Sequence, residues 1–127
     1  MKPRESALRL MRFEAREKGR KVADLESMIR EFEIMTIDLD RQISNEEERT
    51  GVRDPGHFAY STFAKAARQR RDNLQTSVDD LRAKLALAIE ERDIAIESLD
   101  KAEHPEVRDA APRGRRMNLR NPDALAS

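Results

Sequence analysis

The chain has 127 residues, of which 39 % are charged and 38 % hydrophobic, and it contains neither cysteine nor tryptophan. This balance is typical of long solvated helices rather than of a compact core, and the lack of cysteine excludes disulfides, thiol catalysis and thiolate metal sites. The 25 basic and 25 acidic residues cancel. No stretch approaches the roughly 20 apolar residues that span a bilayer, and the basic start lacks the apolar core of a secretory signal, so we expect a cytoplasmic protein.

The first predicted element is a helix over residues about 4–50. Apolar side chains recur there at alternating spacings of three and four, the pattern of a helix that packs along another helix. Pro3 suits a first helical turn. Gly19 costs about 1 kcal/mol relative to Ala and Lys18 places a charge in the apolar row, so we expect the first two turns to fray or bend. Thr36 is a second polar position in the row. The row comprises Leu8, Met11, Ala15, Val22, Leu25, Ile29, Phe32, Leu39 and Ile43.

Residues about 51–56 have the composition of a turn between two helices, with Gly51, Pro55 and Gly56 as the breaking residues. Two starts for the next helix stay open. Asp54 followed by Pro55 is a good cap and first turn, and Ser61 followed by Thr62 is a second possibility.

The second predicted helix covers residues about 57–103 and repeats the same spacing. Its row is interrupted by Arg71 and Arg92, and apolar residues outside the row widen the hydrophobic face between Leu85 and Leu99, where a third helix from a partner would cover it. The row comprises Leu74, Val78, Leu81, Leu85, Ala88, Ala95, Leu99 and Ala102. Two such rows around one turn predict an all-α fold, an antiparallel two-helix coiled-coil hairpin over residues 1–103, whose two rows meet in a shared apolar seam.

The remaining residues, 104–127, begin with His104 and Pro105, which end the helix. Pro112, Gly114 and Pro122 follow without any apolar periodicity. We therefore predict a disordered, mildly basic tail.

Charge is distributed in blocks that support the antiparallel pairing. Residues 1–21 carry a net charge of +5, residues 22–50 carry −6, residues 51–75 carry +3 and residues 76–103 carry −4. A fold at the turn places the basic start beside the acidic end of the second helix, and the acidic part of the first helix beside the arginines of the second. Complementary flanking charges specify the direction and register of coiled coils.

Candidate binding residues lie near the turn. Phe58, Tyr60 and Phe63 are either an exposed docking surface or a cap over the end of the seam, and both interpretations stay open. Arg68, Arg70 and Arg71 would suit nucleic acid or an acidic partner, but the acids of the first helix are their more natural neighbours.

The sequence shows no arrangement suited to catalysis. Glu46, Glu47 and Glu48 are contiguous on a helix and point in different directions, His57 and His104 are far apart in sequence, and no glycine-rich phosphate loop is present. We therefore expect no enzymatic activity, no cofactor, no metal site and no small-molecule substrate.

The segments HFAY (residues 57–60) and AKAARQRRDNL (residues 64–74), preceded by ALRLMRFEAREKGRKVADLESMI near the start, resemble the FliJ family of flagellar export proteins in its alphaproteobacterial form. The resemblance covers roughly residues 1–103. It implies a non-enzymatic, stalk-like antiparallel coiled coil that associates with the hexameric export ATPase and the membrane export gate, peripheral to the inner membrane, and that helps to escort export chaperones. After Glu103 the chain departs from the family pattern, in which more helix is expected.

Two other functions remain open from the residues alone. One is a structural scaffold that self-associates into a four-helix bundle through the wide face near Ile89 and Ile96. The other is a coiled coil associated with nucleic acid, which the mixed charges make the weaker alternative.

Overall fold

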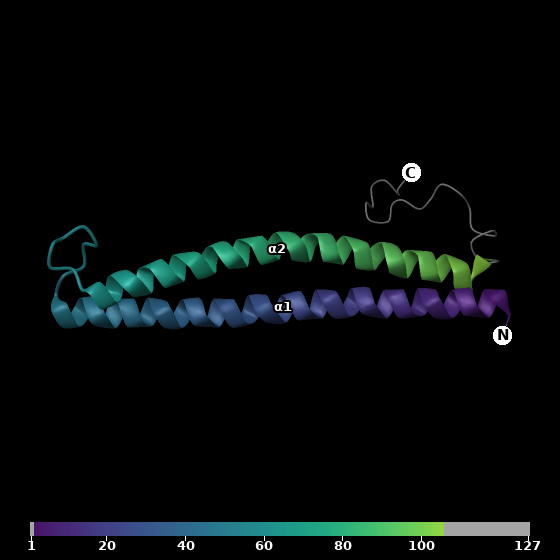
Figure 1. The fold of residues 1–127 in the computed structure, drawn as a ribbon, viewed down its shortest axis with the longest axis horizontal. Coiled ribbons are helices and arrows are strands. Elements are labelled where there is room, and N and C mark those ends of the chain that lie inside the picture. Colours follow the sequence, from purple (N-terminus) through teal and green to yellow (C-terminus); the bar gives the residue numbers. More distant parts are fainter. Residues whose placement is uncertain (1, 106–127) are drawn as a thin grey trace, which may run out of the picture.

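The structure of this protein is a computed structural model that describes residues 2–105. Helix α1 (Pro3–Thr50) and helix α2 (Thr62–Glu103) run antiparallel and side by side, joined by a loop at one end (Figure 1). At 48 residues, α1 is about 72 Å long. The predicted two-helix hairpin is therefore confirmed. The tail predicted to be disordered lies, from residue 106 onward, outside the described residues.

Helix α1 follows its predicted limits closely. Pro3 occupies the first turn, and the helix passes through Gly19 without interruption. It ends at Gly51, which adopts a left-handed backbone (φ 78°) and donates its N–H to the carbonyl of Glu47 at 2.8 Å. A left-handed residue at this point is the usual helix stop that glycine provides.

Helix α2 begins at Thr62, later than the predicted residue 57. Ser61 is its cap, because the Ser61 hydroxyl accepts the N–H of Ala64 at 3.1 Å. The other proposed cap, Asp54, has its side-chain oxygen engaged by the N–H of Gly56 at 2.9 Å and starts a tight turn instead. The prediction of a turn limited to residues 51–56 is therefore wrong, and the loop runs over residues 51–61.

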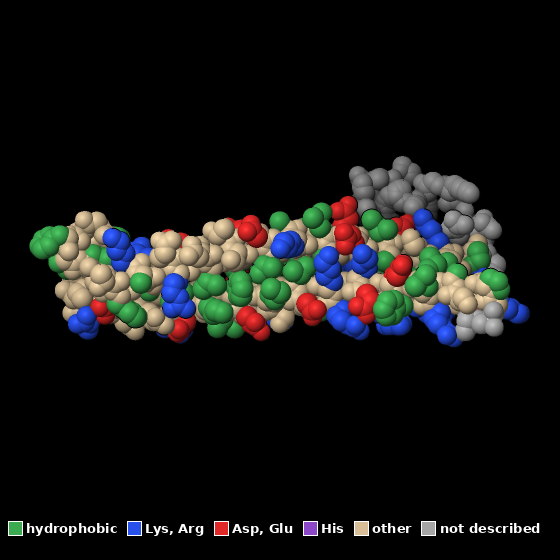
Figure 2. All heavy atoms as spheres, in the orientation of Figure 1, with side chains coloured by type: hydrophobic (Ala, Val, Ile, Leu, Met, Phe, Trp, Pro, Cys, Tyr) green, Lys and Arg blue, Asp and Glu red, His purple; other side chains and the backbone are tan. Residues whose placement is uncertain are grey.

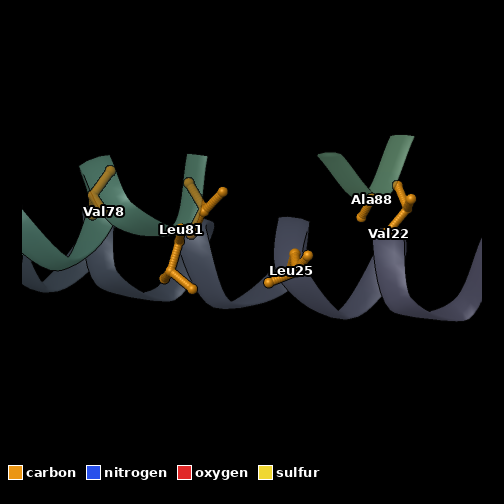
Figure 3. Close-up of a cluster of buried hydrophobic side chains, with 6 residues drawn as sticks. Val22, Leu25, Val78, Leu81 and Ala88 are labelled. Atoms are coloured by element: carbon orange, nitrogen blue, oxygen red, sulfur yellow. The ribbon is translucent and has the colours of Figure 1, made fainter. Parts of the chain in front are cut away.

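The seam holds two clusters of buried side chains. The larger one lies at mid-length, where Val22, Leu25 and Ile29 of α1 pack against α2 (Figure 3). The smaller one, nearer the loop, joins Leu39 and Ile43 to α2. Among the residues predicted for the seam, the structure buries Leu8, Val22, Leu25, Ile29, Leu39, Ile43, Val78, Leu81 and Ala88, and partly buries Met11, Ala15, Phe32, Leu74, Leu85, Ala95, Leu99 and Ala102.

Ion pairs between the helices follow the predicted charge blocks. Bases near the start of α1 meet acids near the end of α2, and acids in the second half of α1 meet arginines of α2. Exposed pairs of this kind add little stability, but they fix which residues lie opposite one another. The pairs are Arg12–Glu103 (2.8 Å), Lys18–Glu91 (3.6 Å), Glu33–Arg82, Asp40–Arg71 (3.0 Å) and Glu47–Arg68 (3.1 Å).

Candidate docking site at the tip of the hairpin

The loop of residues 51–61, called the tip below, is held in shape by its own hydrogen bonds. The N–H of His57 donates to the carbonyl of Asp54 at 2.9 Å, and the N–H of Tyr60 donates to the carbonyl of His57 at 3.0 Å. The carboxylate of Asp54 accepts from Gly56, as described above. Consecutive bonds of this kind give a short loop a defined backbone without a hydrophobic core of its own.

Phe58 stands at the outermost part of the tip with 95 % of its surface exposed. Its ring stacks on that of His57, with centroids 4.7 Å apart and planes inclined by 24°. The Nδ1 atom of His57 in turn accepts the N–H of Ala59 at 2.9 Å, which fixes the imidazole against the loop. The tip therefore presents a large aromatic side chain on an ordered support, and hydrophobic side chains project at this end of the rod (Figure 2).

Tyr60 faces the opposite way and closes the end of the seam. It is 8 % exposed, and its hydroxyl donates to Oε2 of Glu47 at 2.6 Å while accepting from Nε of Arg68 at 2.8 Å. The same carboxylate oxygen accepts from Nη2 of Arg68 at 3.1 Å. We call these three residues the clamp, because they tie the tip to both helices at once.

The clamp alters the acidity of its members. The hydrogen bond from Tyr60 lowers the pKa of Glu47 below its ordinary value, and Arg68 lowers it further against the opposing effect of burial. Burial raises the pKa of Tyr60, and its hydrogen bond to Glu47 raises it further. The clamp therefore holds a charged carboxylate and a neutral phenol at neutral pH.

A second carboxylate supports the start of α2. Oε2 of Glu46 accepts the hydroxyl of Ser61 at 2.6 Å, so the capping residue is itself held by α1. Arg49 donates to both carboxylate oxygens of Glu46, at 3.0 and 2.8 Å. Its hydrogen bonds, followed by that of Ser61, lower the pKa of Glu46 from 4.5 to about 2.

The structure separates the three aromatic residues predicted to act together. Tyr60 caps the seam, Phe58 is exposed, and Phe63 is 54 % exposed on the first turn of α2. The two interpretations of the cluster thus fall on different residues. Capping belongs to Tyr60, and only Phe58 and Phe63 offer surface to a partner.

The three arginines are separated in the same manner. Arg68 belongs to the clamp, and Arg71 contacts Asp40 of α1 and the adjacent Asp72. Arg70 is exposed. Two of the three guanidinium groups therefore already lie against carboxylates of their own chain, which weakens the case for nucleic acid.

Sequence reasoning did not identify Glu47 as a structural residue. It is 7 % exposed and faces the seam, four residues after Ile43, which itself follows Leu39 by four. Two successive steps of four bring a new helical position onto the seam. That spacing, together with a tyrosine and an arginine just after the turn, is the signal by which the clamp could have been found.

The described residues contain no group of three or more histidine or acidic side chains that would hold a metal ion. Within the same residues, neither helix is long and apolar enough to cross a membrane. The chemistry that the tip supports is recognition of a surface, by an exposed aromatic ring on a fixed loop. Comparison with protein-family models, with curated proteins and with solved structures finds no match to this chain.

Proposed function

We propose that this protein is a non-enzymatic accessory protein of the flagellar type III export apparatus. It acts as a stalk that links the export ATPase to the export gate at the inner membrane and assists the delivery of chaperones and their substrates. It resides in the cytoplasm and associates with the membrane only through the apparatus.

The observation that carries this proposal is the location of the FliJ-like segments. Residues 57–60 belong to the tip and include both the exposed Phe58 and the buried Tyr60, and residues 64–74 lie in the first turns of α2. The part of the chain with the most distinctive resemblance is therefore also the part that presents Phe58 to solvent. A long rod with an ordered docking end suits a protein that connects two separate bodies.

Binding measurements with the purified components test the proposal. The chain is expected to co-purify with the export ATPase and with the cytoplasmic part of the gate at micromolar concentrations, and its deletion is expected to abolish motility. Absence of binding to both components, with motility intact after deletion, would show the proposal to be wrong.

Substitution of the exposed aromatic ring tests the role of the tip. Phe58→Ala removes a ring that is 95 % exposed and belongs to neither buried cluster, so the melting temperature is expected to stay nearly unchanged. Affinity for a tip partner is expected to fall about tenfold or more, as for a typical aromatic hot spot. Phe13→Ala is the matched control, because Phe13 is a half-exposed phenylalanine near the opposite end of the rod. Equal losses in both variants would contradict docking through the tip.

A further inference from the structure

The two sides of the seam differ in how many ion pairs link α1 to α2 across them. On one side, ion pairs bridge the helices through Arg12, Glu33 and Glu47 of α1, whose partners lie on α2. These three residues are separated by whole multiples of seven, so a coiled coil keeps them on one side of the seam along its full length. We call this the bridged side.

The other side is marked by the contact of Lys21 with Glu91, at 4.0 Å. Met28 and Met35 follow Lys21 at intervals of seven and therefore lie on the same side. On α2, Ile94 lines a shallow surface groove together with Met11, Glu14 and Lys18 of α1, and Leu87 precedes Ile94 by seven. We call the surface formed by Met28, Met35, Leu87 and Ile94 the open face.

The apolar side chains of the open face are exposed to solvent in the single hairpin. Met28 and Met35 are 41 and 42 % exposed, and Leu87 and Ile94 are 61 and 58 % exposed. Figure 2 shows hydrophobic side chains forming a band along the groove between the helices at mid-length. An apolar band on an otherwise highly charged rod marks a contact surface, even though the Lys21–Glu91 contact crosses it, and methionine side chains adapt readily to a facing helix.

We propose that the open face is the contact surface for a second copy of this chain, so that two hairpins pair into a four-helix bundle. This face shares Leu87 and Ile94 with the wide face predicted between Leu85 and Leu99, but it excludes Ile89 and Ile96. Ile96 is exposed, whereas Ile89 packs against the core cluster. Both residues follow Arg82 at intervals of seven, so they lie on the bridged side.

Charge complementarity favours a second copy as the occupant. Each helix is charged oppositely at its two ends: the block of residues 1–21 has a net charge of +5 and that of residues 22–50 has −6, whereas α2 runs from basic to acidic. If the two-fold axis is perpendicular to the rods, α1 of one copy packs antiparallel to α1 of the other, and α2 packs antiparallel to α2. If the axis is parallel to the rods, α1 of one copy packs against α2 of the other. Basic segments meet acidic ones in both arrangements, so the rod complements itself.

The size of the open face sets the expected affinity. Together with the groove that Ile94 shares with Lys18, it extends over residues 18–35 of α1, about 25 Å, and over two helices of about 10 Å each, which gives roughly 500 Å² per copy. The total of about 1,000 Å² lies at the lower limit for specific protein interfaces. We therefore expect a reversible dimer with a dissociation constant in the micromolar range.

Sedimentation equilibrium of the full chain between 1 and 300 μM, values chosen to bracket that range, tests the proposal. The wild-type chain is expected to pass from monomer to dimer, with a melting temperature that rises with concentration. Met28→Glu combined with Met35→Glu places two carboxylates in the face and is expected to weaken dimerisation about tenfold or more.

The matched control is Phe13→Glu combined with Ile96→Glu, two exposed apolar residues that lie outside the open face. This variant carries the same added charge and is expected to dimerise like the wild type. Circular dichroism at low concentration establishes that both variants remain helical. A wild type that stays monomeric up to 300 μM, or a control that weakens association equally, overturns the proposal.

The absence of cysteine from the chain allows a second measurement. Met35→Cys and Ile96→Cys each introduce a single thiol, the first on the open face and the second on the bridged side. Spin labels at position 35 are expected to report contacts between copies that vanish on dilution, and labels at position 96 are expected to report none. Contacts at position 96 alone would overturn the assignment of this face.

Discussion

The two ends of the rod are built differently. At the turn end, Leu39 and Ile43 of α1 are buried against Ala67 of α2, Ala64 is buried as well, and the clamp covers the last turn. At the end that carries the start of α1, Leu8 is the one buried residue of α1 before Val22 among those described, and α2 has none after Ala88 within its described length. Both ends belong to the same coiled coil, but only the turn end is fully packed.

The difference follows from which residues occupy the seam. Beyond the central cluster the seam contains Ala15, Ala95 and two charged side chains, Lys18 and Arg92. Alanine buries little apolar area, and a lysine or arginine must keep its charged group in water, so each such position contributes less than a leucine. We infer that the turn end anchors the fold and that the opposite end opens first.

The largest expected effect on the free energy of unfolding comes from replacing a buried leucine at the turn end, compared with a buried leucine at the opposite end. Leu39→Ala removes a side chain that is 3 % exposed within a closed cluster, and we expect it to lower the free energy of unfolding by about 3 kcal/mol. Leu8→Ala removes a side chain that is 8 % exposed near a weakly packed end, where about 1 kcal/mol is expected because fraying already exposes it. Urea denaturation followed by circular dichroism measures both. Equal losses would contradict the comparison.

Replacing charged seam residues by leucine at the end of the rod opposite the turn is expected to raise the free energy of unfolding. Lys18 and Arg92 are partly exposed at seam positions, and replacing both by leucine buries apolar side chains in their place. We expect about 1 kcal/mol for each substitution, or about 2 kcal/mol together, because neither site becomes fully buried. The measurement is the urea midpoint at low micromolar concentration. A matched pair, Arg30→Leu with Glu90→Leu on exposed positions, is expected to leave the midpoint unchanged.

The hairpin itself was predictable because it depends on periodicity. The spacing of apolar residues placed both helices and the seam, and the charge blocks gave the antiparallel register. The start of α2 was not predictable from capping preference alone, because Asp54 and Ser61 are both good caps. Ser61 is the cap in the structure, and Glu46 accepts its hydroxyl from fifteen residues earlier in the chain, a contact that exists only in the folded hairpin.

The candidate site was predictable only in outline. Composition located the aromatic residues at the turn, but their separate roles depend on where the loop ends. With α2 starting at Thr62, Tyr60 lies in the loop and reaches back to Glu47, while Phe58 points to solvent. The hydrogen bond between Tyr60 and Glu47 makes Tyr60 the cap and leaves Phe58 as the docking residue. This bond joins residues 13 positions apart, so no local sequence pattern predicts it.

A smaller effect is expected from the clamp. Tyr60→Phe retains the aromatic ring and removes the hydroxyl that joins Glu47 to Arg68. We expect a loss of about 1 kcal/mol, equivalent to a fall of about 4–8 °C in melting temperature. Binding of a tip partner through Phe58 is expected to persist, since the loop keeps its own hydrogen bonds. A loss of partner binding larger than that of Phe58→Ala would contradict the division between clamp and docking surface.

The smallest expected effect is a dependence of the melting temperature on pH, caused by Glu46 at the turn end. The pKa of Glu46 is about 2 in the folded chain and 4.5 ordinarily, so its contribution is complete above pH 4.5 and is lost as the pH falls toward 2. The melting temperature of the wild type is therefore expected to exceed that of Glu46→Gln at pH 6, and the difference is expected to close on acidification. Glu48→Gln, at an exposed neighbouring position, is the control. A difference of equal size and pH dependence in the control would show that the contacts of Glu46 with Arg49 and Ser61 do not stabilise the turn end.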